Sequence, residues 1–232
     1  MTAIGTDIRM LLFPRFCKVC GNKLGKSEDH ICTVCLRQLP MTHYDPMALN
    51  PVMQHFVGFP AVQHASAFYF YTHGNKYTSL ITQSKYSDKP EIGQYLGRLA
   101  ASELEKSGFF EGIDCLIPVP LSRWRRWKRG YNQSEWIARG LAEVARLPLT
   151  TDNLIRVKHN ETQTHMTRDE RWKNVQGIFA VRHPERLAGR HVLIVDDVIT
   201  TGATLMSCAE TLSNAVPDIR ISIFTLAAAQ ND

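Results

Sequence analysis

The sequence lacks the features of a membrane or secreted protein. Its apolar runs are all shorter than the roughly 20 residues that a membrane-spanning helix needs. The N-terminal stretch is interrupted by Arg9 and Pro14, and no small-residue cleavage site follows it, so it does not resemble a signal peptide. We therefore expect a cytoplasmic protein without a membrane span.

Two common nucleotide-binding motifs are also missing. The triphosphate-binding P-loop has the pattern GxxxxGK[ST], in which a lysine follows the second glycine. No lysine follows Gly202. A dinucleotide fingerprint would need three spaced glycines, and this stretch has one. There is no internal repeat and no low-complexity tract, which argues against a solenoid or a disordered chain.

What is present describes an ordinary globular protein. The chain has 232 residues, of which 44% are hydrophobic and 21% charged, enough for one good-sized α/β domain and a small appendage. Its formal charge of +5 gives only a weak preference for anionic partners. Because thiols stay reduced in the cytoplasm, its six cysteines are read first as metal ligands or buried residues rather than disulfides.

Four of these cysteines form two CxxC pairs near the N-terminus. Eleven residues separate the pairs, and this intervening stretch is polar and contains glycine, so it can fold back and bring both pairs to one ion. A thioredoxin-like redox motif would leave one pair unexplained. The spacing predicts a structural tetrahedral zinc site with the ligands Cys17, Cys20, Cys32 and Cys35.

The rest of the chain alternates between strand and helix patterns. We predict a zinc-binding knuckle over residues 1–40, a linker or packing arm over 41–64 and the main domain over 65–232. The polar segment 158–177 is long for a connection, as mobile lids and binding loops often are, and its composition does not decide its role. The alternation implies a mostly parallel, helix-covered sheet, with expected strands at 65–71, 115–119, 153–158, 191–196 and 219–226 and helices at 76–85, 91–106, 134–146 and 201–213.

One stretch, VLIVDDVITTGATL at residues 192–205, carries the strongest chemical signal. A buried β-branched run ends in Asp196 and Asp197, and a turn rich in threonine leads into a helical pattern. Backbone N–H groups at such a turn can hold a phosphate, and the two carboxylates can accept hydrogen bonds from vicinal ribose hydroxyls. A phosphoacceptor or metal site would not explain the turn. The stretch therefore predicts a ribose 5-phosphate site, with the phosphate held by Thr200, Thr201, Gly202, Ala203 and Thr204.

A basic, aromatic stretch follows the expected strand 115–119. We predict a loop over residues 121–135, placed where the strand opens toward the crevice of an α/β sheet. Its cations suit phosphates, and its tryptophans suit either stacking on single-stranded nucleic acid or simple packing on the domain surface. The residues considered for nucleic acid are Arg123, Trp124, Arg125, Arg126, Trp127 and Lys128.

These motifs together resemble a known family. VLIVDDVITTGAT is similar to the phosphoribosyl pyrophosphate (PRPP) motif of type I phosphoribosyltransferases. With the four-cysteine knuckle, the chain resembles the ComF/GntX-like family over nearly all its length. The further matching positions are Lys85-Tyr86, IPVPL at 117–121, RGYNQSE at 129–135, and Thr162-Gln163, Arg171 and Asn174.

The resemblance implies a fold and a ligand. The fold class would be α/β, a type I phosphoribosyltransferase fold with a parallel sheet flanked by helices and a small hood, plus the N-terminal zinc knuckle. PRPP would bind together with Mg²⁺, held largely by the ligand's own oxygens. Lys85, Tyr86 and Arg129 would join the acidic pair and the 200–204 turn as PRPP-binding residues, and the pyrophosphate side would be formed by the backbone after strand 115–119 together with Arg129.

The resemblance leaves two functions open. The family is associated with DNA uptake in naturally transformable bacteria, which implies single-stranded DNA and the uptake machinery as partners. The protein would be a phosphoribosyltransferase acting on an unidentified acceptor, or a non-catalytic PRPP-sensing module that binds single-stranded DNA through its basic loop. Residues 41–75 match no base-binding pattern, so neither the acceptor nor a catalytic residue is predicted.

Overall fold

The computed structural model describes residues 14–72, 74–86, 90–157 and 177–230. Most of the polar segment 158–177 falls outside this range, and so do Thr162, Gln163, Arg171 and Asn174 of the family pattern. No helix in the described part of the chain is long and apolar enough to cross a membrane.

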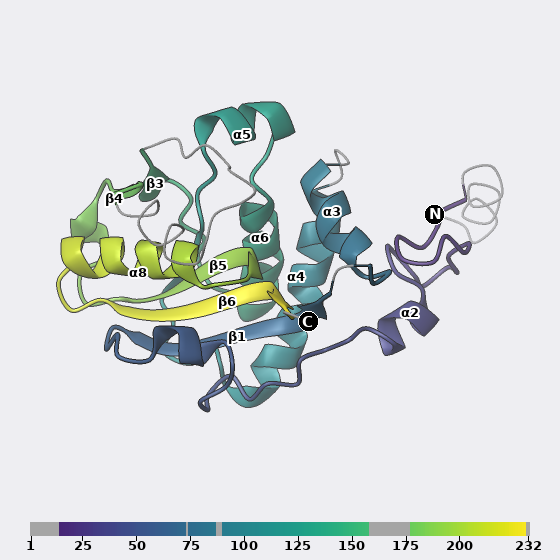
Figure 1. Cartoon of the computed structure of the whole chain (residues 1–232), viewed down its shortest axis with the longest axis horizontal. Coiled ribbons are helices and arrows are strands. Elements are labelled where there is room, and N and C mark those ends of the chain that lie inside the picture. The colour runs from purple at the N-terminus through teal and green to yellow at the C-terminus, as the bar shows by residue number, and fades with distance from the viewer. Residues whose placement is uncertain (1–13, 73, 87–89, 158–176, 231–232) are drawn as a thin grey trace.

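A four-stranded parallel sheet forms the centre of the molecule (Figure 1). Its strand order is β1-β6-β5-β2, where β1 is Val62–Tyr71, β6 is Arg220–Ala229, β5 is His191–Ile199 and β2 is Cys115–Pro118. The two central strands, β5 and β6, are buried over most of their length, which is why they are written as continuous apolar runs. Because all four strands are parallel, their carboxyl ends meet at one edge of the sheet.

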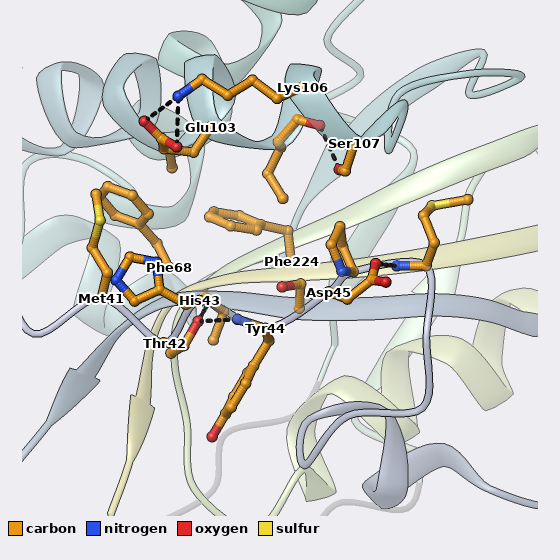
Figure 2. Close-up of a pocket in the computed structure, with 16 residues that line it drawn as sticks. Met41, Thr42, His43, Tyr44, Asp45, Phe68, Glu103, Lys106, Ser107 and Phe224 are labelled. Carbon is orange, nitrogen blue, oxygen red and sulfur yellow. Dashed lines mark hydrogen bonds and ion pairs between the residues drawn. The ribbon is translucent and has the colours of Figure 1, made fainter.

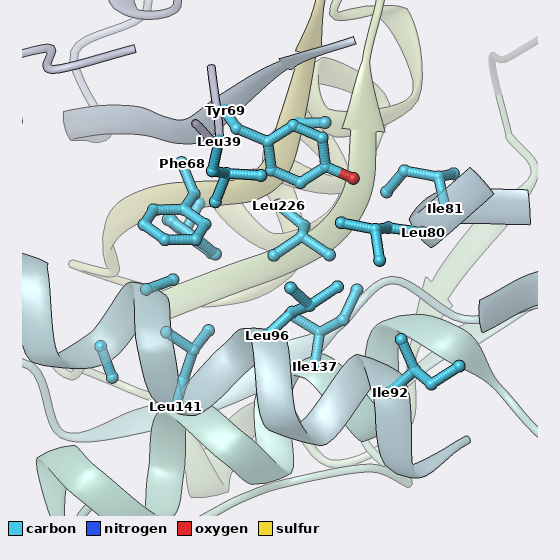
Figure 3. Packing of buried hydrophobic residues seen from close by; sticks show 14 of the residues in the cluster. Leu39, Phe68, Tyr69, Leu80, Ile81, Ile92, Leu96, Ile137, Leu141 and Leu226 are labelled. Carbon is cyan, nitrogen blue, oxygen red and sulfur yellow. The ribbon is translucent and has the colours of Figure 1, made fainter. Parts of the chain in front are cut away.

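Helices cover both faces of this sheet. On one face, α4 (Glu91–Leu104) and α6 (Gln133–Ala145) pack with α3 (Thr78–Tyr86), and Leu96, Ile137 and Leu226 meet in that core (Figure 3). On the other face, α8 (Ala203–Ala215) packs against the sheet and a small antiparallel hairpin. The hairpin is made of β3 (Leu154–Arg156) and β4 (Phe179–Val181).

Helices α4 and α6 approach each other very closely. A Cβ atom added to Gly97 would overlap the carbonyl oxygen of Ile137, and one added to Gly140 would overlap that of Gln94. Glycine at both positions lets the two backbones touch, and this fixes where α6 begins relative to the sheet.

Shorter elements complete the chain. The N-terminal knuckle carries α2 (Thr33–Arg37), and its buried residues share one hydrophobic core with α3 and α4. Residues 40–42 then run along the edge of β1. The remaining short helices are η1 (Met53–Phe56), η2 (Glu105–Ser107), α5 (Arg123–Arg129) and η3 (Pro184–Arg186).

The predicted parallel sheet flanked by helices is confirmed, and most elements lie within a few residues of their expected bounds. The expectation of a plain loop over residues 121–135 is wrong, because the basic stretch folds into α5. Ser122 caps its N-terminus by accepting a hydrogen bond from the backbone N–H of Arg125, and Gly130 ends it in the left-handed conformation. Strand β5 also runs beyond Asp196 to Ile199, so the acidic pair lies inside the strand.

A pocket of about 580 Å³ lies between the arm at residues 41–47 and the second half of α4 (Figure 2). Phe68 and Phe224 form part of its wall, and the ion pair between Glu103 and Lys106 stands at its border. It includes none of the residues to which the sequence assigns a role.

Candidate functional site

Asp196 is a buried carboxylate near the carboxyl end of β5. Its Oδ1 accepts a hydrogen bond of 2.8 Å from the hydroxyl of Ser134 in the first turn of α6, and another of 2.9 Å from the backbone N–H of Asp197. Burial, together with the neighbouring charge of Asp197, raises the pKa of Asp196 to about 7. Carboxylates with pKa values shifted this far are typical of binding and catalytic sites.

Asp197 faces the end of α3. Its Oδ2 lies 2.9 Å from Nζ of Lys85, and its Oδ1 accepts a hydrogen bond of 2.7 Å from the backbone N–H of Val198. The hydroxyl of Tyr131 donates to the carbonyl of Ser84 at 2.7 Å, which ties the end of α3 to the segment before α6. The side chain of Tyr86 lies outside the described part of the chain.

The turn between β5 and α8 is the candidate anion cradle. Residues Ile199 to Leu205 and Asp196 surround a small open hollow of about 30 Å³. Gly202 takes a left-handed conformation with φ of 75°, and the N–H of Ala203 makes a long contact of 3.5 Å with the hydroxyl oxygen of Thr201. The N–H groups of this first turn have no intrahelical partners, so they can bind an anion, which the helix dipole also favours.

His55 also lies against this turn, and no motif in the sequence points to it. A Cβ atom placed on Gly202 would come within 3.0 Å of Cβ of His55, so the histidine packs directly on the glycine. The side chain of Asn50 fixes the arm here by donating to the carbonyl of Ala65 and accepting from the backbone N–H of Val52. His55 and Ser134 were both missed because their contacts join segments far apart in sequence.

The basic aromatic stretch stands apart on α5. Trp127 is 83% exposed and Trp124 is 52% exposed, so neither is packed into the core. Nζ of Lys128 lies 5.2 Å from the ring centre of Trp124, a cation–π contact. At the C-terminal end, Arg129 turns toward α6 and donates to Oε1 of Gln133 at 2.8 Å. The exposed ring of Trp127 is available for stacking.

The four N-terminal cysteines come together as expected from their spacing. Their sulfur atoms all lie within 4.8 Å of one another, so the cluster could hold a metal ion. The sulfurs of Cys20 and Cys32 are 3.8 Å apart, and a tetrahedral site with zinc–sulfur bonds of about 2.3 Å implies the same separation, about 3.8 Å. The pKa values of the cluster's thiols are shifted in opposite directions. Although burial alone would raise it, backbone N–H groups that donate to Cys17 Sγ lower the pKa of this thiol to about 7, whereas burial and the neighbouring thiols raise the pKa of Cys35 to about 12.

This cluster is bonded directly to α3. The backbone carbonyl of Lys18 accepts hydrogen bonds from Ser79 Oγ at 3.1 Å and from Gln83 Nε2 at 2.9 Å. The hydroxyl of Tyr77 donates to the carbonyl of Cys35 at 2.9 Å. Helix α3 is thus held at one side by the knuckle and near its C-terminal end by Asp197.

Comparison with known proteins identifies the domain. The model of the phosphoribosyl transferase domain matches residues 82–232, which include β5, the acidic pair and the cradle. The chain belongs to this family. Within it, the chain is 30% identical over 216 residues to the DNA utilization protein YhgH of Salmonella typhi, covering 88% of this chain and 92% of the relative.

Further relatives confirm the ComF-like branch of the family. Competence protein F of Haemophilus influenzae is 29% identical over 212 residues, covering 90% of this chain and 82% of that protein. Competence protein ComFC of Bacillus subtilis is 26% identical over 222 residues, covering 91% and 83%.

Two solved structures are similar to parts of the chain at lower identity. The allosteric regulatory enzyme of purine biosynthesis has a TM-score of 0.41 and 20% identity, covering 62% of this chain and 30% of that chain. Adenine phosphoribosyltransferase from Saccharomyces cerevisiae has a TM-score of 0.37 and 16% identity, covering 59% and 68%.

Proposed function

We propose that this protein binds PRPP with Mg²⁺ and transfers its phosphoribosyl group to an acceptor that neither its sequence nor its fold identifies. One observation carries this proposal: Asp196 of the acidic pair lines the same hollow as residues 199–205 of the anion cradle. A site with this arrangement holds both ends of a ribose 5-phosphate.

The cradle would bind the 5′-phosphate. The N–H groups at the start of α8 donate to phosphate oxygens, the hydroxyls of Thr200, Thr201 and Thr204 add donors, and the helix dipole favours the negative charge. Ala203 and Gly202 contribute backbone only, which lets the phosphate approach closely.

The acidic pair would orient the ribose. An ionised carboxylate accepts stronger hydrogen bonds from hydroxyl groups than a neutral acceptor does. Ser134 holds Asp196 in place. Lys85 forms an ion pair with Asp197, and its ammonium group would also attract the negatively charged PRPP. In this proposal Lys85, Tyr86 and Arg129 complete the PRPP site, with Arg129 on the pyrophosphate side.

The reaction needs no covalent nucleophile from the protein. The bond from C1′ to pyrophosphate breaks, the electron pair leaves with pyrophosphate, and the acceptor forms the new bond to C1′ through an oxocarbenium-like transition state. Mg²⁺ bound to the ligand's own oxygens would supply charge neutralisation for the leaving group. The protein's basic side chains next to that group would add electrostatic stabilisation.

The four-cysteine cluster would hold zinc in a structural role. Four thiolate ligands leave no open position for a substrate, and sulfur-rich tetrahedral sites favour zinc. The names of the relatives, DNA utilization protein and competence protein, support a role for this chain in DNA uptake or use.

A second candidate function is favoured by α5. A helix with two exposed tryptophans among five cations suits a stacking platform for single-stranded DNA, so the protein would be a PRPP-sensing module without turnover. The residues involved would be Arg123, Trp124, Arg125, Arg126, Trp127 and Lys128.

A thermal-shift experiment tests the PRPP site. Mg²⁺-PRPP should raise the melting temperature, because a ligand that binds only the folded state stabilises it. The double variant Asp196→Asn, Asp197→Asn should lose this shift and still melt cooperatively. Asp218→Asn, in a left-handed position that asparagine tolerates, is the control and should keep it. Absence of any shift at millimolar ligand would exclude the ribose-phosphate site.

Two further measurements separate the candidate functions. Release of pyrophosphate from Mg²⁺-PRPP in the presence of a cell metabolite extract would support transfer, and binding without release would support the sensing module. Replacing Arg125, Arg126 and Arg129 with alanine should reduce the salt dependence of single-stranded DNA binding. Unchanged DNA binding would remove the nucleic-acid candidate.

A further inference from the structure

Helix α3 lies between the cysteine knuckle and the acidic pair, and it contacts both. Nζ of Lys85 is 2.9 Å from Oδ2 of Asp197, and the side chain of Gln83, two residues earlier, donates to the carbonyl of Lys18 in the knuckle. Successive residues of an α-helix are rotated by about 100°, so Gln83 and Lys85 point to nearly opposite sides of α3. One side of the helix therefore faces the predicted zinc site, and the other faces the candidate PRPP site.

The contacts with the knuckle are made at the turns that carry the metal ligands. Lys18 lies inside the first CxxC pair, and its carbonyl accepts from Ser79 Oγ at 3.1 Å as well as from Gln83 Nε2 at 2.9 Å. The hydroxyl of Tyr77 donates to the carbonyl of Cys35, in the second pair, at 2.9 Å. Both CxxC turns are thus bonded to the α3 region.

Metal binding would fix the position of these carbonyls. Four metal–sulfur bonds would hold the two CxxC turns to each other, and metal binding at such sites contributes directly to folding. In the metal-free protein the turns lose these bonds, and the carbonyls that α3 contacts are less constrained. Shifts of about 1–2 Å are typical when a packed helix responds to a change at a neighbouring site. A shift of that size would break the 2.9 Å contact between Lys85 and Asp197.

Apolar packing connects the same elements. Leu80 and Ile81 of α3 are buried in one core with Cys17, Ile31 and Cys35 of the knuckle. Coupling between two sites is carried by packed side chains, hydrogen bonds and rigid secondary structure that form a continuous chain. From the ligand turns to the acidic pair, each step in the structure is a covalent bond or a direct contact.

We propose that metal binding at the knuckle and PRPP binding at the acidic pair are cooperative, and that Gln83 is the positioning residue that couples them through α3. This inference rests on the proposed function, because it takes PRPP as the ligand of the acidic pair. With metal bound, α3 is docked on the knuckle and Lys85 is held where its ammonium group attracts PRPP. Because coupling between two binding sites is reciprocal, bound PRPP strengthens metal binding by the same factor.

Competition for zinc with a chelator of known affinity tests the proposal. In the unaltered full chain, saturating Mg²⁺-PRPP should strengthen zinc binding by at least about fivefold, the lower end of typical coupling between two sites. The variant Asp196→Asn, Asp197→Asn should show no such change. Because this variant does not bind PRPP, it also corrects for zinc that free PRPP takes up in the same solution.

Variants of α3 test the route. Ser79→Ala with Gln83→Met removes both side-chain donors to Lys18 and introduces residues that favour a helix. This variant should keep about one zinc per chain, but Mg²⁺-PRPP should change its zinc affinity by less than about twofold. The control Thr82→Ala removes an exposed hydroxyl that donates to the carbonyl of Thr78 within α3, and it should keep the full effect of PRPP.

Four outcomes would overturn the proposal. If Mg²⁺-PRPP gives no thermal shift, the proposed function fails and the coupling fails with it. If the thermal shift is present but zinc affinity does not respond to PRPP, the PRPP site stands and the coupling is wrong. A chain that binds no zinc has no metal site to couple. If the Ser79, Gln83 variant responds as strongly as the unaltered chain, Gln83 is not the positioning residue. Circular dichroism and melting curves of each variant establish that it is folded.

Discussion

The ammonium group of Lys85 lies 2.9 Å from Oδ2 of Asp197, and this contact joins the last turn of α3 to the ribose end of the candidate PRPP site. The side chain of Asp197 is 9% exposed and that of Lys85 is 24% exposed, so the pair is shielded from solvent far more than a surface ion pair. Lys85 therefore balances the charge of Asp197 in a partly buried environment.

A double-mutant cycle should measure this interaction. For Lys85→Met and Asp197→Asn we expect a coupling of about 1–3 kcal/mol in the free energy of unfolding at pH 8, because each single change leaves a partly buried charge alone. Arg98 and Glu143, whose side chains are 41% and 48% exposed, form the control pair and should couple by less than about 1 kcal/mol. Equal coupling in the two cycles would show that shielding at Asp197 has no effect.

The raised pKa of Asp196 makes a pH-dependent prediction. In the unfolded chain this carboxyl ionises near its usual value of 3.8, whereas in the folded protein it ionises at about 7. The group therefore favours folding at pH values below 3.8, and that contribution is lost as the pH rises to 7. Asp196→Asn should be more stable than the unaltered protein at pH 8, by up to about 4 kcal/mol, and the advantage should shrink toward pH 5.

Urea unfolding at pH 5, 6.5 and 8 measures this difference. The control Asp218→Asn should show no comparable trend, since that residue lies on an exposed turn. An Asp196→Asn variant whose stability difference stays constant across this range would contradict the raised pKa.

Gly202 should matter for binding as well as for backbone strain. Gly202→Ala places a side chain at φ of 75° and against His55, so we expect a loss of stability of about 1–2 kcal/mol and at least about tenfold weaker PRPP binding. Gly189→Ala is a matched control, because Gly189 has φ of 70° with open space around it. It should show the strain in melting experiments and keep PRPP affinity in calorimetry.

The contact between α4 and α6 can be tested in the same way. Gly140→Ala would drive a methyl group into the backbone of α4 and should lower the free energy of unfolding by at least about 2 kcal/mol. Gly93→Ala lies on the same helix pair with its nearest neighbours at 3.5 Å, so it should be neutral or stabilising by about 0.5–1 kcal/mol. Denaturant titration of both variants decides whether the close approach is specific to Gly140.

Metal analysis tests the cysteine cluster. We expect about one zinc per chain, and Cys35→Ser should lose the metal and melt at a lower temperature, because zinc binding contributes to folding. Cys208→Ala removes a buried thiol outside the cluster and should keep the zinc. A folded, metal-free protein would contradict the structural role.

Local patterns were sufficient to predict most of the sheet and the acidic pair. The run VLIV specifies a buried strand because its neighbours on both faces are apolar, and the turn that follows it needs residues adjacent in sequence. The dense positive charge of residues 123–129 predicts an exposed loop, whereas the structure has helix α5 there. Ser122 and Gly130, which cap its two ends, were the evidence for a helix.

Contacts between distant segments could not be predicted in this way. Ser134 and Asp196 are 62 positions apart, and their hydrogen bond exists only because α6 begins beside the end of β5. His55 meets Gly202 through the packing of the arm against the turn after β5. No periodicity or residue spacing in the sequence predicts these contacts. The family resemblance implies that Lys85 binds PRPP, and the structure shows that its ion-pair partner is Asp197.

Ser79, Gln83 and Tyr77 of the α3 region donate hydrogen bonds to the cysteine knuckle, so removing the knuckle would affect α3. A fragment that starts at residue 65 would keep the cradle and all of the sheet except the first three residues of β1, but it would leave one side of α3 without its partners. Helix α3 has nine residues, too few to be stable alone in water, so its end would fray and Lys85 would leave Asp197. Truncated preparations would then understate ligand affinity, and the full chain is the appropriate material for every measurement above.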